Sequence, residues 1–287
     1  MMKKTIADLG DLTGKKVLIR VDFNVPLDKV SGEIKNDRRI RGAVPTIKAL
    51  LKAGASVIAM SHLGRPSGDA AKDKHLTMDK VAERLADLLD VPVTKAASTV
   101  VGPEVAAAAK MLPPGGVLML ENVRFDPREQ KNDPAFAAEL AGLADAYVND
   151  AFGTCHNDKD ASMVAVPAAM KAAGKPRAVG LLVAKELEII DGLMERTALG
   201  VPKNEVVAAA MADAVTGAEG HWGDYPAIVP LLPSGPDAAA PHLTWNGRPF
   251  AGGEATFFEI SGCYRRYHAP LCRTIFLGTP PDFLKRA

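Results

Sequence analysis

The chain has 287 residues, which is enough for two domains that each bury a hydrophobic core. Hydrophobic residues make up 47% and charged residues 24%, a globular composition that excludes a disordered or fibrous chain. The formal net charge of +1 provides no overall basic field, and there is no aromatic platform motif, so neither nucleic acid nor an anionic membrane is expected as a partner.

The cysteines and the N-terminus indicate the compartment. Cys155, Cys263 and Cys272 form no CxxC pair, which suits a reducing compartment better than a disulfide framework or a zinc ribbon. The start, MMKKTIADLG, has no apolar stretch of the kind found in signal peptides, and no apolar run reaches about 18 residues. We therefore expect a cytoplasmic protein in which Cys155 is a small buried residue.

The first two thirds of the chain alternate short apolar runs with longer amphipathic ones. In chain order the predicted elements are a strand at 16–21, a helix at 40–51, a strand at 55–60, helices at 78–89 and 103–112, a strand at 117–120, a helix at 134–143 and a strand at 146–148. Asn36 and Asp37 can cap the first helix and Gly54 can end it, whereas Pro45 predicts a kink or a later start. The alternation predicts an α/β fold with a doubly wound, mostly parallel sheet.

Polar side chains follow the predicted strands at the points where the strands end. They are Asp22 and Asn24, His62 and Arg65, Arg124, and Asn149 with Asp150. In doubly wound sheets, ligands bind outside the carboxyl ends of the strands. One shared site is therefore favoured over scattered surface charge.

The pattern changes from Glu195 onward. The tail predicts a helix at 204–217, apolar runs at 228–232 and 256–260, and a hairpin-like segment at 264–277 within a stretch rich in Gly and Pro. We place the domain boundary between Met194 and Glu195, which gives domains of residues 1–194 and 195–287.

Five motifs in the first domain resemble the N-terminal domain of the phosphoglycerate kinase family. In order they are VDFNVPL, NDRRIRGAVPTIKALL, SHLGRP, LENVRF and VNDAFGTCH, within a match that runs from Lys4 through Leu187. The resemblance implies a glycolytic phosphotransferase domain that binds 3-phosphoglycerate or 1,3-bisphosphoglycerate. It also implies that magnesium-ATP or ADP binds to a second, C-terminal domain.

The resemblance implies roles for the residues after the first strand. Asp22 and Asn24 are similar to the residues that hydrogen-bond the glycerate hydroxyl and carboxylate, although they can instead cap a turn. Arg39 is similar to the catalytic arginine that stabilises the transferring phosphoryl group. Because Arg38 and Arg41 lie close by, the choice of Arg39 as the arginine that faces the ligand rests on the resemblance. Phosphoryl transfer needs positioning and charge neutralisation, which fits the lack of an obvious nucleophile.

Three further residues are similar to the family's basic patch for phosphate and carboxylate: His62, Arg65 and Arg124. The planar guanidinium of arginine binds both anions bidentately. A lone histidine is more often structural, and its place in HLGRP favours the functional role. The family has a further arginine after the FGT-x-H segment, where this chain has Asn157. That loss should weaken ligand binding about ten- to a hundredfold.

The tail does not reproduce the nucleotide motifs of the family, so we expect no recognisable cofactor site and doubtful phosphoryl transfer. Instead it resembles the first part of a pita-bread hydrolase of the creatinase and ectoine hydrolase branch. That resemblance implies His242 as a proton-transfer residue and Glu259 as a retained carboxylate. Metal-dependent relatives have aspartates where this chain has Glu259 and Pro270, so no metal is expected.

Three interpretations remain open. The first is a phosphoglycerate-kinase-like protein that binds a phosphorylated small acid. The second is a metal-independent C–N hydrolase, and the third is a non-functional hybrid or truncated chain. Half of a pita-bread sheet leaves strands without partners, so we expect the tail to promote self-association.

Overall fold

The structure, a computed structural model, describes residues 3–28, 31–196, 202–205, 207–208, 225–240, 243–264 and 267–282. Its backbone contacts divide the chain into two compact units, Met1–Glu186 and Leu187–Ala287. The predicted boundary at Met194 lies inside helix α7 (Leu181–Arg196), so its position stays a prediction. Within the described residues, no helix is long and apolar enough to cross a lipid bilayer.

The first unit is built on a six-stranded sheet with the order β3-β4-β2-β1-β5-β6, and every neighbouring pair is parallel. The strands are β1 (Lys16–Val21), β2 (Ser56–Met60), β3 (Val93–Lys95), β4 (Val117–Met119), β5 (Ala146–Asp150) and β6 (Arg177–Val179). The helices are α1 (Arg38–Lys52), α2 (Ala70–Asp73), α3 (Asp79–Leu89), α4 (Pro103–Met111), α5 (Pro134–Gly142), α6 (Ala165–Ala172) and the start of α7. The predicted α/β fold is confirmed.

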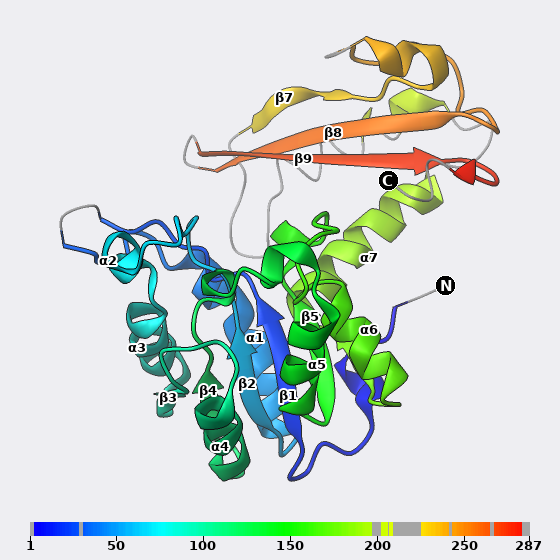
Figure 1. Cartoon of the computed structure of the whole chain (residues 1–287). Coiled ribbons are helices and arrows are strands. Elements are labelled where there is room, and N and C mark those ends of the chain that lie inside the picture. Colours follow the sequence, from blue (N-terminus) through cyan, green and yellow to red (C-terminus); the bar gives the residue numbers. More distant parts are fainter. Residues whose placement is uncertain are drawn as a thin grey trace. The chain divides into compact units, whose positions relative to one another are not determined.

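Helices cover both faces of this sheet (Figure 1). Val17, Ile19 and Val21 of β1 pack with the apolar faces of α1 and α3, whereas Leu18 packs with α4, α5 and α6. Successive side chains of a strand point to opposite faces, so a strand buried on both sides is mostly apolar, and the buried polar exception in β1 is Arg20. This two-sided burial holds the strand ends in place.

Most predicted elements lie within a residue or two of their observed bounds, and the differences have local causes. The sequence analysis missed β3 and β6, and also the helices α6 and α7. β4 is equally short, but its three residues are all buried and apolar, whereas β3 and β6 are partly exposed and lack such a run. Pro45 lies inside the continuous helix α1. The helix continues through the proline because Ile40, Ala43 and Ile47 bury its apolar face against the sheet.

The second unit contains a smaller antiparallel sheet with the order β7-β8-β9. Its strands are β7 (Tyr225–Leu231), β8 (Ala255–Tyr264) and β9 (Tyr267–Phe276). The predicted apolar runs fall on β7 and β8. The segment predicted as a hairpin, 264–277, is instead mainly the single strand β9, which pairs with β8 to form the hairpin. The helix predicted at 204–217 lies mostly outside the described residues.

Candidate functional site

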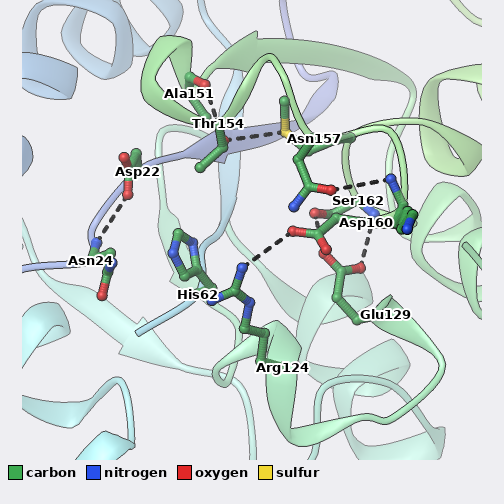
Figure 2. A network of polar contacts seen from close by, with 12 residues as sticks. Asp22, Asn24, His62, Arg124, Glu129, Ala151, Thr154, Asn157, Asp160 and Ser162 are labelled. Carbon is green, nitrogen blue, oxygen red and sulfur yellow. Dashed lines mark hydrogen bonds and ion pairs between the residues drawn. The ribbon is translucent and has the colours of Figure 1, made fainter. Parts of the chain in front are cut away.

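The polar residues predicted at strand ends share one edge of the parallel sheet. Strands β4, β2, β1 and β5 are consecutive neighbours and run in the same direction, so their carboxyl ends meet there. A close view of that edge shows Asp22, Asn24, His62 and Arg124 together (Figure 2). The loop after β5 also reaches it, because a Cβ added to Gly153 would lie 3.0 Å from Asp22 Oδ2.

Asp22 forms an ion pair with Arg39, one of three arginines close together at the start of α1. Arg39 Nη1 donates to Asp22 Oδ2 over 2.6 Å, and the Asp22 side chain is 12% exposed against 51% for Arg39. Arg41 pairs instead with Asp37, the N-cap residue of α1, at 3.0 Å. Of Arg38, Arg39 and Arg41, the described contacts bring only Arg39 to Asp22.

Asn24 connects the loops that follow β1 and β2. Its backbone N–H donates to Asp22 Oδ1 over 3.2 Å, and its side-chain Oδ1 accepts from Gly64 N–H over 2.8 Å. Ser61 Oγ accepts from the backbone N–H of Phe23 over 2.8 Å. Asn24 is therefore engaged in loop structure, as the turn interpretation expects, and it also lies at the candidate site.

His62 is buried and neutral. Burial, followed by the charges of Arg20 and Arg124, lowers the pKa of His62 from 6.5 to about 3. Nη2 of Arg20, which can only donate, lies 3.2 Å from His62 Nδ1. Because Nδ1 is the acceptor, the ring proton of the neutral imidazole resides on Nε2. His62 can thus donate one hydrogen bond to an anion, but it adds no positive charge at neutral pH.

Arg20 is a site residue that the sequence analysis missed. It is fully buried, and its Nε donates to Ser162 Oγ over 2.9 Å. Ser162 in turn donates to the buried Glu129 through its hydroxyl (2.5 Å) and its backbone N–H (2.8 Å). Burial raises the pKa of Glu129, against the hydrogen bonds from Ser162 and the charge of Arg20. An arginine inside the otherwise apolar run VLIRV was the signal that could have revealed this network.

Arg124 lies in the short helix η3 (Val123–Phe125), in the loop that follows β4. Its Nη1 donates to the carbonyl oxygen of Gly64 over 3.1 Å, and its Nη2 lies 3.6 Å from Asp160 Oδ2. Figure 2 shows this pair beside His62, Glu129 and Ser162. Both Arg124 Nε and Asp160 Oδ2 are buried without a hydrogen-bond partner.

Asn122 joins the loops after β2 and β4. Its Oδ1 accepts from the backbone N–H groups of Leu63 (3.2 Å) and Arg124 (3.1 Å). Its Nδ2 donates to the carbonyl oxygens of Leu63 (2.7 Å) and Leu76 (3.0 Å). All the hydrogen-bonding capacity of this buried amide is used, and it fixes the positions of both His62 and Arg124.

The remaining predicted residues lie at the rim. Arg65 is exposed, and its side chain has no hydrogen bond or ion pair within the described part of the chain. Asn157 is half-buried, and its Oδ1 accepts from the backbone N–H of Lys159 over 3.1 Å. The expectation of a buried Cys155 is wrong: Cys155 is exposed at the C-terminal end of the short helix η5 (Phe152–Thr154).

The described part of the structure does not show the two residues predicted for a hydrolase site, His242 and Glu259, next to each other. His242 lies outside the described residues. Glu259 lies on β8, opposite Cys272 of β9. Over the described ranges, no group of three or more His, Cys, Asp or Glu side chains could hold a metal ion.

Comparisons with known proteins separate two regions of the chain. Residues 6–208 match the family model described as phosphoglycerate kinase, and residues 168–287 match that of metallopeptidase family M24. A phosphoglycerate kinase of Rhodopirellula baltica is 55% identical over 190 residues, covering 66% of this chain and 46% of the relative. The chloroplastic phosphoglycerate kinase 1 of Arabidopsis thaliana is 50% identical over 194 residues, covering 67% and 38%.

Solved structures agree on the first region. A phosphoglycerate kinase from Coxiella burnetii matches with a TM-score of 0.56 at 34% identity, covering 70% of this chain and 46% of that one. A phosphoglycerate kinase from Pyrococcus horikoshii matches with a TM-score of 0.57 at 32% identity, covering 68% and 46%. The chain spans about half the length of the relatives it matches.

Proposed function

The chain belongs to the phosphoglycerate kinase family, and on that premise we propose that its first unit binds 3-phosphoglycerate or 1,3-bisphosphoglycerate. The site is the sheet edge where β1, β2, β4 and β5 end. The observation that carries the proposal is that Arg124 and the His62 Nε2–H donor lie beside Asp22 (Figure 2), and Asp22 holds Arg39 at the same edge. Arg65 follows His62 on the same loop and adds a cation at the rim.

Each group has a chemical task in this proposal. Arg39 and Arg124 present planar N–H donors that suit carboxylate and phosphate oxygens. Neutral His62 donates one hydrogen bond from Nε2 and costs the site no buried charge. Asp22 holds Arg39 in place and offers a carboxylate oxygen to the ligand hydroxyl. Together they position a small anion without forming a covalent bond to it.

Calorimetric titration with 3-phosphoglycerate tests the proposal. Arg39→Ala and Arg65→Ala should each weaken binding about ten- to a hundredfold, because each removes a charge-assisted contact. Arg38→Ala is the matched control, since Arg38 is exposed on the same helix and has no described contact with the site. If Arg39→Ala and Arg65→Ala both bind 3-phosphoglycerate as tightly as the parent and the Arg38→Ala control, the site assignment is wrong.

We also propose that a polypeptide of these 287 residues transfers no phosphoryl group by itself. Transfer needs nucleotide phosphates and magnesium held in line with the acceptor. Beyond residue 208 the chain matches metallopeptidase family M24 instead of phosphoglycerate kinase. A coupled kinase assay on the purified chain should show no ATP-dependent turnover, and robust turnover would contradict this part of the proposal.

The hydrolase interpretation stays as an alternative because of the match over residues 168–287. Of its two implied residues, only Glu259 is described, and it lies on a strand. Amide substrates of the creatinase type test it: hydrolysis that is lost in both His242→Ala and Glu259→Gln would favour it.

A further inference from the structure

The candidate site contains more negative charge than its sequence motifs suggest. Four charged side chains at this sheet edge are buried or nearly buried: Arg20, Arg124, Glu129 and Asp160. The Asp160 side chain is 2% exposed, and that of Arg124 is 14% exposed. The two arginines and two carboxylates sum to zero, so the cluster is internally neutral when all four are ionised.

Asp160 offsets the charge of Arg124 without accepting a hydrogen bond from its guanidinium group. The pair is 3.6 Å apart, too far for a hydrogen bond, and Arg124 Nε and Asp160 Oδ2 both lack partners. A buried carboxylate at this distance strongly lowers the local positive potential. Arg124 therefore keeps donors for a ligand, while its attraction for an anion is reduced.

The other cations at the edge do not restore that potential. Arg39 is paired with Asp22 at 2.6 Å, and His62 is neutral. At Asn157, half-buried at the rim, the side chain is an uncharged amide. Arg65 is the remaining cation of the predicted patch, and the solvent around it weakens its pull.

We propose that Asp160 competes electrostatically with the anionic ligand for Arg124 and keeps the affinity of the site for that ligand low. This inference rests on the proposed function and deepens it. Asp160 touches no reacting atom in this account; it acts through Arg124. Removing its charge while keeping its shape should make the net charge of the cluster more positive by one and tighten binding.

The test compares three variants by calorimetry with 3-phosphoglycerate. Asp160→Asn should bind about tenfold more tightly than the parent. Asp160→Glu keeps the charge and should stay within about threefold of the parent. Asp158→Asn removes the same charge from an exposed residue two positions earlier, and should change affinity less than twofold.

Because Asp160 Oδ2 makes no hydrogen bond, Asp160→Asn loses none, and a thermal melt checks that the fold is kept. If that variant melts early, Asp160→Ser removes the charge with a smaller side chain. Equal affinity of the parent and the charge-removing variant would overturn this inference and leave the proposed function standing. Binding by neither protein would contradict the proposed function, and the inference with it.

Discussion

The described residues of the two units bury apolar surface to very different extents. In the first, two clusters of buried side chains line opposite faces of one parallel sheet. In the second, the described residues form one small cluster of Val207, Leu232, Phe250 and Phe258. Burying a charge costs several kcal/mol, so a network such as Arg20 with Glu129 requires a large core around it. The site edge is possible because the sheet below it is covered on both faces.

The largest expected effect is a split unfolding transition. Burial contributes about 25 cal/mol per Å² of apolar surface, so the second unit should unfold first. Both tryptophans, Trp222 and Trp245, belong to the second unit, so fluorescence reports on it, whereas far-UV circular dichroism is dominated by the helices of the first. In urea, the fluorescence midpoint should lie about 2 M below the dichroism midpoint. Coincident midpoints would contradict the expectation that the second unit is less stable than the first.

A matched pair of core substitutions, one in each unit, tests whether the two units unfold separately. Phe136 is fully buried in α5 beneath the Arg128 guanidinium, and Phe258 is buried in β8. Phe136→Ala should lower the free energy of unfolding by about 3–5 kcal/mol, seen in the dichroism transition. Phe258→Ala should shift only the fluorescence transition. If either variant moves both transitions equally, the units do not unfold separately.

Acid should weaken the first unit through His62. The folded state lowers the pKa of His62 to about 3, so between pH 6.5 and 3 the unfolded chain binds a proton that the folded chain does not. Stability therefore falls as pH falls through that window, by about 1.4 kcal/mol per pH unit for this residue. Urea unfolding followed by circular dichroism measures it.

His62→Gln should flatten that part of the pH profile, because glutamine cannot take up the proton. His75→Gln is the control, since His75 is exposed. A profile for His62→Gln parallel to that of the parent would show that other groups cause the slope.

The smallest expected effect concerns the start of α7. Asp150 Oδ1 accepts from the backbone N–H groups of Leu182 (3.0 Å) and Val183 (3.3 Å), and Thr46 Oγ1 accepts from that of Leu181 (2.9 Å). Asp150→Ala should cost the first unit about 1 kcal/mol through loss of this cap. Asp150→Asn keeps the Oδ1 acceptor and should cost less. The dichroism midpoint in urea checks both, and an unchanged midpoint for Asp150→Ala would show that the cap is dispensable.

The sequence predicted the framework of the first unit better than its site. The predicted strands and the polar residues after them, such as Asp22 and His62, follow from local pattern, because strand burial and chain direction are readable in order. The partners of these residues are not local. Asp160 meets Arg124, and Ser162 meets Arg20, across more than thirty residues of chain, and no period encodes that. Charge balance at the site therefore had to come from the three-dimensional structure.

Asn122 has a consequence for the entropy of binding. Its amide connects the loops that carry His62 and Arg124 to each other and to Leu76 through four hydrogen bonds. Loops held in this way have already lost their conformational freedom when the chain folds. A ligand that arrives at this edge does not have to order them, and the free energy of its contacts is not spent on that task. The shape of the binding edge is thus settled during folding, before any ligand is present.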